Sequence, residues 1–145
     1  GAVIIQGFNP EHYAIKYALK HNYRGFYNEE MTLRKTFGYP PFTRIALLRV
    51  TGAKIEAVEK SARLLGKLSR SLKGHKDFKG IRLLGPAPAP IFRLRGKVRF
   101  QELIFSQSPA LLGRFVRHLT EKFKAENPAR AGIKLDLDRD PISLL

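Results

Sequence analysis

The chain has 145 residues and a strong excess of basic side chains, 27 lysine and arginine against 12 aspartate and glutamate, for a net charge of +15. This length suits one ordinary domain, or one small domain and part of another. The absence of cysteine excludes disulfides, zinc knuckles and thiol catalysis within these residues. There is no signal peptide and no apolar run of about 18 residues, so we expect a cytoplasmic protein that does not span a membrane.

The first forty residues predict a strand and two helices. Residues 1–6 form a continuous apolar run, which is typical of a strand buried on both faces inside a larger α/β domain. Asn9 and Pro10 are residue types that cap and begin helices, and we expect a helix over 10–20. A second helix is predicted over 23–37.

A proline pair separates this part from the rest. Gly38 can end the second helix, because glycine tolerates the left-handed conformation common at that position. Residues 39–42 read Tyr-Pro-Pro-Phe, a short segment that two prolines make stiff. We therefore predict two parts, residues 1–42 and residues 43–145. A proline-rich ligand for an SH3-type module is the competing interpretation of the segment.

The basic charge is concentrated in the second part. Residues 1–42 carry 5 basic and 3 acidic side chains, and residues 43–145 carry the other 22 and 9. Nucleic acid is the commonest partner of a domain this basic, and acidic protein tails or an anionic membrane surface are less common ones.

Residues 43–145 predict an α+β domain. The expected elements are a strand over 43–51, a helix over 53–73, a strand over 81–84, a hairpin over 92–105, a helix from Ser108, a loop over 127–132 and a strand over 133–137. Pro86, Pro88 and Pro90 indicate a polyproline-type bridge that cannot pair in its middle. The order is close to a ferredoxin-like plait with one added strand. The buried helix stripes should be Val58, Ala62, Leu65, Leu68 and Leu72, and Leu112, Phe115, Val116, Leu119 and Phe123.

The stretch around Gly96 predicts a β-hairpin with one apolar and one basic face. Side chains alternate across a strand, and Gly96 can supply the positive φ of a tight turn. We expect four apolar side chains to face the core: Phe92, Leu94, Val98 and Phe100. We expect four basic ones to face solvent: Arg93, Arg95, Lys97 and Arg99. No acid interrupts these cations, so we favour phosphate binding over the alternative, a solvated charged face.

Both helices have a basic side turned away from the apolar stripe. On the first helix, Arg63, Lys67 and Arg70 are candidates to help bind nucleic acid. On the second, Arg114 and Arg117 lie on the polar side.

No constellation of catalytic residues is found. Asp136, Asp138 and Asp140 lie at two-residue spacing, which a metal site or a carboxylate pair could use. We favour the simpler interpretation that they pair with arginine or lysine neighbours in the sheet. We expect no catalytic residue, no metal ligand and no cofactor in this chain.

Several motifs together resemble the primosomal protein N′ (PriA) family, the bacterial replication-restart DNA helicases. The motifs occur in the family's order across the whole chain: Val3-Ile4-Ile5-Gln6, Pro10-x-His12, Tyr23-x-x-Phe26, Arg34, Tyr39-Pro40-Pro41-Phe42, Leu84-Gly85-Pro86-x-Pro88-Ala89-Pro90, Gly96-x-x-Arg99 and Asp138-x-Asp140-Pro141.

The resemblance implies that residues 1–42 are the end of the second helicase lobe and its linker. It implies that residues 43–145 are a C-terminal domain with a fold like that of ribosomal protein S10. Members of the family are ATP-dependent 3′-to-5′ helicases whose ATP, Mg²⁺ and Zn²⁺ sites lie upstream, so these residues should not hydrolyse ATP. The implied partners are forked and single-stranded DNA, single-stranded-DNA-binding protein and other primosome proteins, at replication forks in the nucleoid.

The family also binds the acidic tail of single-stranded-DNA-binding protein, partly through a helix of this domain. The arginine and glutamine of that pocket have no counterpart in the helix after Ser108, so Arg114 and Arg117 are substitutes by position only. Our first hypothesis is therefore a DNA-binding module. The alternatives are a module that binds only proteins, or an RNA binder of ribosomal type. None of these has a membrane partner.

Overall fold

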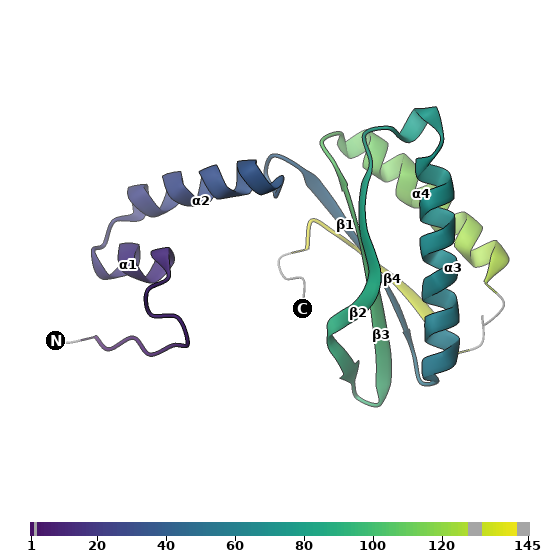
Figure 1. The fold of residues 1–145 in the computed structure, drawn as a ribbon, viewed down its shortest axis with the longest axis horizontal. Coiled ribbons are helices and arrows are strands. Elements are labelled where there is room, and N and C mark those ends of the chain that lie inside the picture. Colours follow the sequence, from purple (N-terminus) through teal and green to yellow (C-terminus); the bar gives the residue numbers. More distant parts are fainter. Residues whose placement is uncertain (2, 128–131, 142–145) are drawn as a thin grey trace. The chain divides into compact units, whose positions relative to one another are not determined.

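The computed structural model describes residues 1, 3–127 and 132–141 (Figure 1). The chain divides into two compact units, Gly1–Tyr39 and Pro40–Leu145. Within the described ranges, no helix is both long enough and apolar enough to cross a membrane. The expected loop over 127–132 lies largely outside the described residues.

The first unit is a pair of helices, α1 (Tyr13–Leu19) and α2 (Tyr23–Phe37). The hydroxyl of Tyr13 donates a hydrogen bond to the carboxylate of Glu30, and the rings of Tyr13 and Phe26 stack with their centroids 6.1 Å apart. No residue of either helix is buried. Polar contacts and ring stacking, rather than an apolar core, therefore hold this pair together.

The strand expected at the start of this unit is absent. Residues 3–7 have no regular structure and are exposed, and Ala2 lies outside the described residues. An apolar run becomes a buried strand only where neighbouring strands pair with it. No strand in the described part of the chain pairs with this segment.

The start expected for the first helix is also wrong, whereas the second helix is confirmed. α1 begins at Tyr13 instead of Pro10, because the imidazole of His12 caps the helix by accepting a hydrogen bond from the N–H of Ala14 at 3.2 Å. α2 has the expected bounds, and Gly38 ends it in the left-handed conformation with a φ of 64°.

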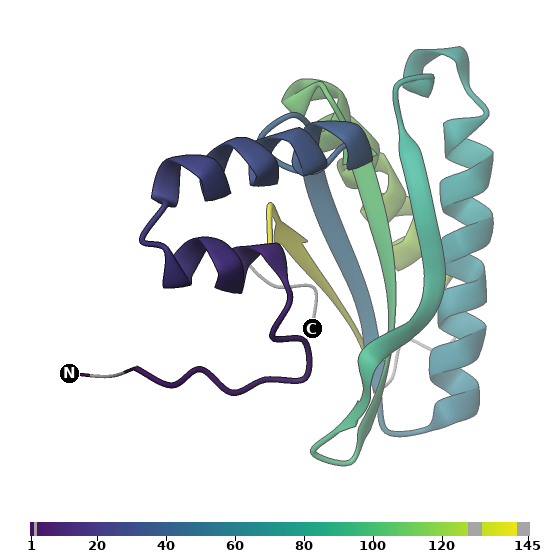
Figure 2. The same ribbon diagram turned by 60° about the vertical axis from the view of Figure 1, so that its left-hand side comes forward.

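The second unit is a four-stranded antiparallel sheet with two helices on one face (Figure 2). In spatial order the strands are β2 (Arg82–Leu94), β3 (Lys97–Ser106), β1 (Arg44–Gly52) and β4 (Ile133–Arg139), the helices are α3 (Ile55–Lys73) and α4 (Pro109–Glu126), and a short 3₁₀ turn η1 spans Lys76–Phe78. The chain order β1-α3-β2-β3-α4-β4 is that of a ferredoxin-like plait, so the predicted α+β fold class is confirmed.

The core lies between the helices and one face of the sheet. Because side chains alternate along β1, Ala46, Leu48 and Val50 all point toward the helices. All ten residues expected in the two helix stripes are buried. The hydroxyl of Ser108 caps α4 as expected, accepting a hydrogen bond from the N–H of Leu111 at 3.2 Å. The opposite face of the sheet carries a smaller buried cluster of Ile45, Leu47, Leu103 and Phe105.

β2 is longer than predicted, and the described part of the domain has no added strand. The strand runs continuously through Pro86, Pro88 and Pro90, where a bridge outside the sheet was expected. Pro88 lies opposite Phe100 of β3. This is possible because β2 is an edge strand, where a residue without an N–H removes no bond from a second neighbour.

α3 approaches the sheet closely where it crosses β2. A Cβ atom on Gly66 would lie 2.5 Å from Cδ of Pro86, so this contact requires glycine. One turn away, the hydroxyl of Ser69 donates a 2.6 Å hydrogen bond to the fully buried carboxyl of Glu102. Burial raises the pKa of Glu102, while the Ser69 bond and the charge of Arg70 act to lower it. A polar bond inside the core thus ties α3 to β3.

Candidate nucleic-acid interface

The hairpin between β2 and β3 ends in a two-residue turn. Leu94 pairs with Lys97, and Arg95 and Gly96 between them have φ values of 49° and 75°. Two positive φ angles are typical of a type I′ turn, which suits the right-handed twist of the strands. The turn expected at Gly96 is therefore confirmed, but Arg95 lies in the turn and not on a strand face.

The two-residue turn also corrects the predicted faces. The expected pattern placed Leu94 and Val98 on one side, which requires these two residues to pair. The turn pairs Leu94 with Lys97 instead, on the face away from the helices, and Leu94 is 47% exposed. The other three apolar residues do contact the core as expected: Phe92, Val98 and Phe100.

Three of the four hairpin cations are exposed, but Arg93, opposite Val98, and Lys97, opposite Leu94, lie on different faces of the hairpin instead of one. Arg93, Arg95 and Lys97 form no ion pair with any acid in the described ranges. They lie within five consecutive residues around the turn, so their charges repel one another unless an anion neutralises them. We call these three residues the hairpin tip.

The fourth cation does not face solvent as expected. Arg99 is only 8% exposed, and its Nε–H donates a 2.8 Å hydrogen bond to the carbonyl of Ile91. The cause is an irregularity in β2. Pro88 lies opposite Phe100 and Arg93 lies opposite Val98. The four β2 residues between them, 89–92, therefore have a single counterpart in β3, which is Arg99.

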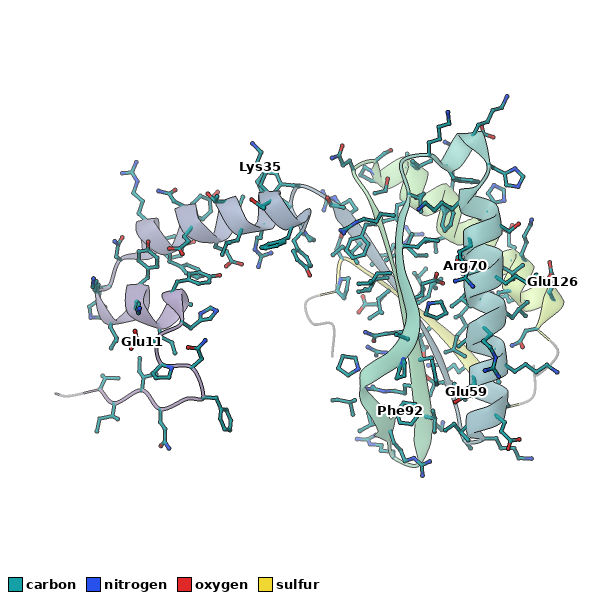
Figure 3. All side chains as sticks on the ribbon, viewed as in Figure 1. Glu11, Lys35, Glu59, Arg70, Phe92 and Glu126 are labelled. Carbon is teal, nitrogen blue, oxygen red and sulfur yellow. The ribbon has the colours of Figure 1, made fainter. Side chains whose placement is uncertain are left out.

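A second group of exposed cations lies along α3. Lys60, Arg63, Lys67 and Arg70 recur at three- and four-residue spacing and are all exposed. Arg63 lies 3.6 Å from Glu59 on the same helix, a weak surface pair. Arg70, labelled in Figure 3, approaches the contact between α3 and β2, because its Nη1 would lie 3.1 Å from a Cβ atom on Gly66. We call these four residues the α3 ridge.

Two of the three aspartates near the end of the chain form the ion pairs favoured from the sequence, whereas Asp138 of β4, opposite Leu47 of β1, forms none among the described residues. Asp136 lies 2.5 Å from Nζ of Lys134. Asp140 lies 3.3 Å from Nη1 of Arg44 and accepts a 3.0 Å hydrogen bond from the N–H of Ile45. No group of metal-ligating side chains occurs in the part of the chain that the structure describes.

The two arginines singled out on α4 are exposed on that helix. Arg114 and Arg117 lie on its polar side. A pocket of about 190 Å³ lies at the start of the same helix, lined by Arg44, Pro109, Leu112, Gly113, Arg139 and Asp140. Residues of β1 and β4, Arg44 and Arg139, thus line this pocket together with residues of α4.

The burial of the Glu102 carboxyl under α3 was not predicted from the sequence. Its position could have been found, because Val98, Phe100, Glu102 and Ile104 alternate along β3 on the face that meets the helices. An acid in such a row must be buried and must find a donor, which is the hydroxyl of Ser69.

The fold and the exposed cations define a small, basic α+β domain. Residues 35–142, most of the chain, match the family described as "Primosomal protein N C-terminal domain". The chain therefore belongs to this family, and the resemblance found in its motifs is confirmed.

Several curated relatives are replication restart proteins named PriA, and they extend well beyond the region of similarity. The chain is 33% identical over 144 residues to the replication restart protein PriA of Synechocystis, and 30% identical over 145 residues to that of Bacillus subtilis. It covers 99% and 100% of its own length in these matches, but only 16% and 17% of the relatives. The chain thus spans about a sixth of their length.

Similar solved structures include de novo designed proteins. Foldit4 covers 67% of this chain and 94% of its own length, with a TM-score of 0.48 and 9% identity. A second design, described as having a ferredoxin fold, covers 68% of this chain and 84% of its own, with a TM-score of 0.48 and 13% identity.

Proposed function

We propose that residues 43–145 bind DNA through its phosphates, as a module of a replication restart protein. The observation that carries the proposal is the hairpin tip, Arg93, Arg95 and Lys97, whose charges no acid in the described ranges neutralises. The α3 ridge supplies further phosphate contacts. Binding of this kind tolerates many sequences, because phosphate contacts carry no base information.

Salt-dependent titration with forked and single-stranded DNA tests the proposal. Three phosphate contacts at the tip correspond to a log–log salt slope of about −2 to −3, or roughly 15- to 60-fold in affinity between about 50 and 200 mM salt. A triple Ala variant of Arg93, Arg95 and Lys97 should therefore weaken binding and flatten the slope by about two to three units.

The matched control removes three exposed cations from the first unit, Lys20, Arg24 and Lys35. This control has the same net charge as the hairpin variant but should keep the wild-type slope within about half a unit. Equal losses of DNA affinity in both triple variants would show that net charge alone accounts for binding, which would contradict the hairpin interface. Tighter binding to structured RNA than to forked DNA would favour the RNA-binding alternative.

A second candidate function is capture of an acidic, hydrophobic-ended protein tail at the start of α4. The pocket there supports it, because Arg139 and Arg44, the latter paired with Asp140, line it together with the apolar residue Leu112. Arg114 and Arg117 on the same helix could contact further acidic residues of such a tail, which we propose to be that of single-stranded-DNA-binding protein. A peptide that loses binding when its last apolar residues are removed would support the pocket, whereas attraction by charge alone would survive that truncation.

We also propose that residues 1–42 complete a helicase lobe in the longer relatives. Neither α1 nor α2 buries a residue, and an apolar pocket of about 430 Å³ lies open on this unit, lined by Ala14, Tyr17, Ala18, His21, Asn22, Tyr23 and Phe26. Helices with so little core of their own gain stability by packing on another element. On this proposal ATP hydrolysis, with its Mg²⁺, and zinc binding belong to other parts of such proteins, and the present residues bind without catalysing.

A further inference from the structure

Arg99 of β3 lies opposite an irregular part of β2, two residues after the last residue of the hairpin tip. Regular pairing of β2 with β3 is interrupted between Pro88, opposite Phe100, and Arg93, opposite Val98. Residues 89–92 therefore have only Arg99 across from them. Such a bulge leaves backbone groups without partners in the sheet and bends the strand.

The guanidinium of Arg99 closes this bulge. Its Nε–H donates to the carbonyl of Ile91 at 2.8 Å, and the residue as a whole is 92% buried. Its Nη2 atom is buried and has no hydrogen-bond partner among the described residues. A guanidinium held in this way is directed at the backbone of its own domain, and little of its surface is left for a phosphate.

We propose that Arg99 is a positioning residue: it fixes the bulge of β2 so that the hairpin tip meets phosphates in one arrangement. This inference rests on the proposed DNA-binding function. The bond to Ile91 lies two residues before Arg93, so it restrains the segment that leads into the tip. Restraining a binding surface before it meets its ligand raises affinity, because less conformational entropy is lost on binding.

The chemistry at this position calls for arginine. The planar guanidinium directs its Nε–H along a fixed line toward the Ile91 carbonyl. A lysine has the same charge but is a flexible, strongly hydrated point charge, and it would extend its ammonium group toward water. A lysine at this position should therefore not hold the bulge of β2, although a lysine could replace an arginine that contacts phosphate.

The test compares Arg99→Lys with the matched variant Arg24→Lys in α2. We expect Arg99→Lys to weaken DNA binding about tenfold and to speed amide hydrogen exchange over residues 89–97, since the loosened tip must be ordered on binding. We expect Arg24→Lys to stay within about twofold of wild type, because Arg24 is exposed in the first unit, outside the proposed interface, and the change keeps the net charge. Full affinity and unchanged exchange in Arg99→Lys would overturn the proposal.

A measurement on the unmodified protein guards against a variant that fails to fold. In ¹H–¹⁵N spectra, the Arg99 Nε–H should exchange slowly and shift little on addition of DNA, whereas those of Arg93 and Arg95 should exchange fast and shift. A large DNA-induced shift at Arg99, or exchange as fast as at Arg93, would contradict the proposal. If the triple Ala variant of the tip binds DNA normally, the hairpin interface fails, while hydrogen exchange still reports whether Arg99 holds the bulge.

Discussion

The helices of the two units are stabilised by different interactions. In the first, α1 and α2 bury no residue, and a tyrosine–glutamate hydrogen bond and stacked rings join them. In the second, α3 and α4 bury complete apolar stripes against a sheet. Isolated helices of these lengths are marginal in water, so burial is the main source of stability for α3 and α4. Mutations should therefore act very differently in the two units.

The largest expected effect is the loss of a core ring. Phe115 is fully buried and meets Phe78 edge to face at 5.1 Å, so Phe115→Ala should lower the free energy of unfolding by about 3–5 kcal/mol. Phe26→Ala in α2, where the ring is only half-buried, should leave the main unfolding transition unchanged. Urea denaturation followed by circular dichroism measures both, and equal losses would show that the two units unfold together.

A smaller loss is expected where α3 crosses β2. Gly66→Ala should destabilise the protein by about 1–3 kcal/mol, because the new methyl group would overlap the ring of Pro86. Gly113 in α4 is the control, since a Cβ atom there has no neighbour within 4 Å. Gly113→Ala should stabilise the protein by about 0.5–1 kcal/mol through helix propensity. A loss of stability in both variants would show that the effect of Gly66→Ala does not come from its contact with Pro86.

Glu102 should make stability depend on pH. Burial raises its folded-state pKa, so the folded protein binds the carboxyl proton of Glu102 more tightly than the unfolded chain does. The contribution to stability is present below the unfolded pKa and is lost as pH rises through the folded pKa. Glu102→Gln should flatten the profile of unfolding free energy from acid to neutral pH, measured by urea titration at each pH. A profile as steep as that of wild type would assign the pH dependence to other groups.

The smallest effect is expected in the first unit. Tyr13→Phe removes the hydroxyl that is the main cause of the lowered pKa of Glu30, and a hydrogen bond between two partly exposed side chains contributes little to stability. The pair stabilises the helices above the ordinary carboxyl pKa, and this contribution disappears as pH falls through the lowered value. Amide exchange in α1 at pH 7 and in acid should show the loss. Lys35→Gln, which changes an exposed side chain of α2, should leave the hydrogen exchange of the α1 amides unaltered.

Regular periodicity made much of the second unit predictable. The stripes of α3 and α4, the Ser108 cap and the turn at Gly96 all follow from local rules of spacing and residue type. In the first unit, the same rules misplaced the start of α1, where His12 supplies the cap in place of Asn9. The apolar run over 3–6 suggested a strand, but pairing partners are a tertiary property that one segment cannot supply.

The candidate interface was predictable only in part, because alternation assumes an uninterrupted strand. Arg93, Arg95, Lys97 and Arg99 look equivalent in the sequence, yet the bulge of β2 buries the last of them. Nothing in the order of the residues shows where four residues of one strand will face one residue of the next. The three prolines of β2 were misread for a related reason, since an edge strand tolerates them and an inner strand does not.

Those prolines have a consequence for how copies of the protein behave in concentrated solution. A sheet can grow when a foreign strand bonds to the backbone donors of its outermost strand. Pro86, Pro88 and Pro90 leave alternate positions along β2 without any such donor. This flank is a poor template for strand addition, so a neighbouring chain cannot readily extend the sheet into an aggregate from this side.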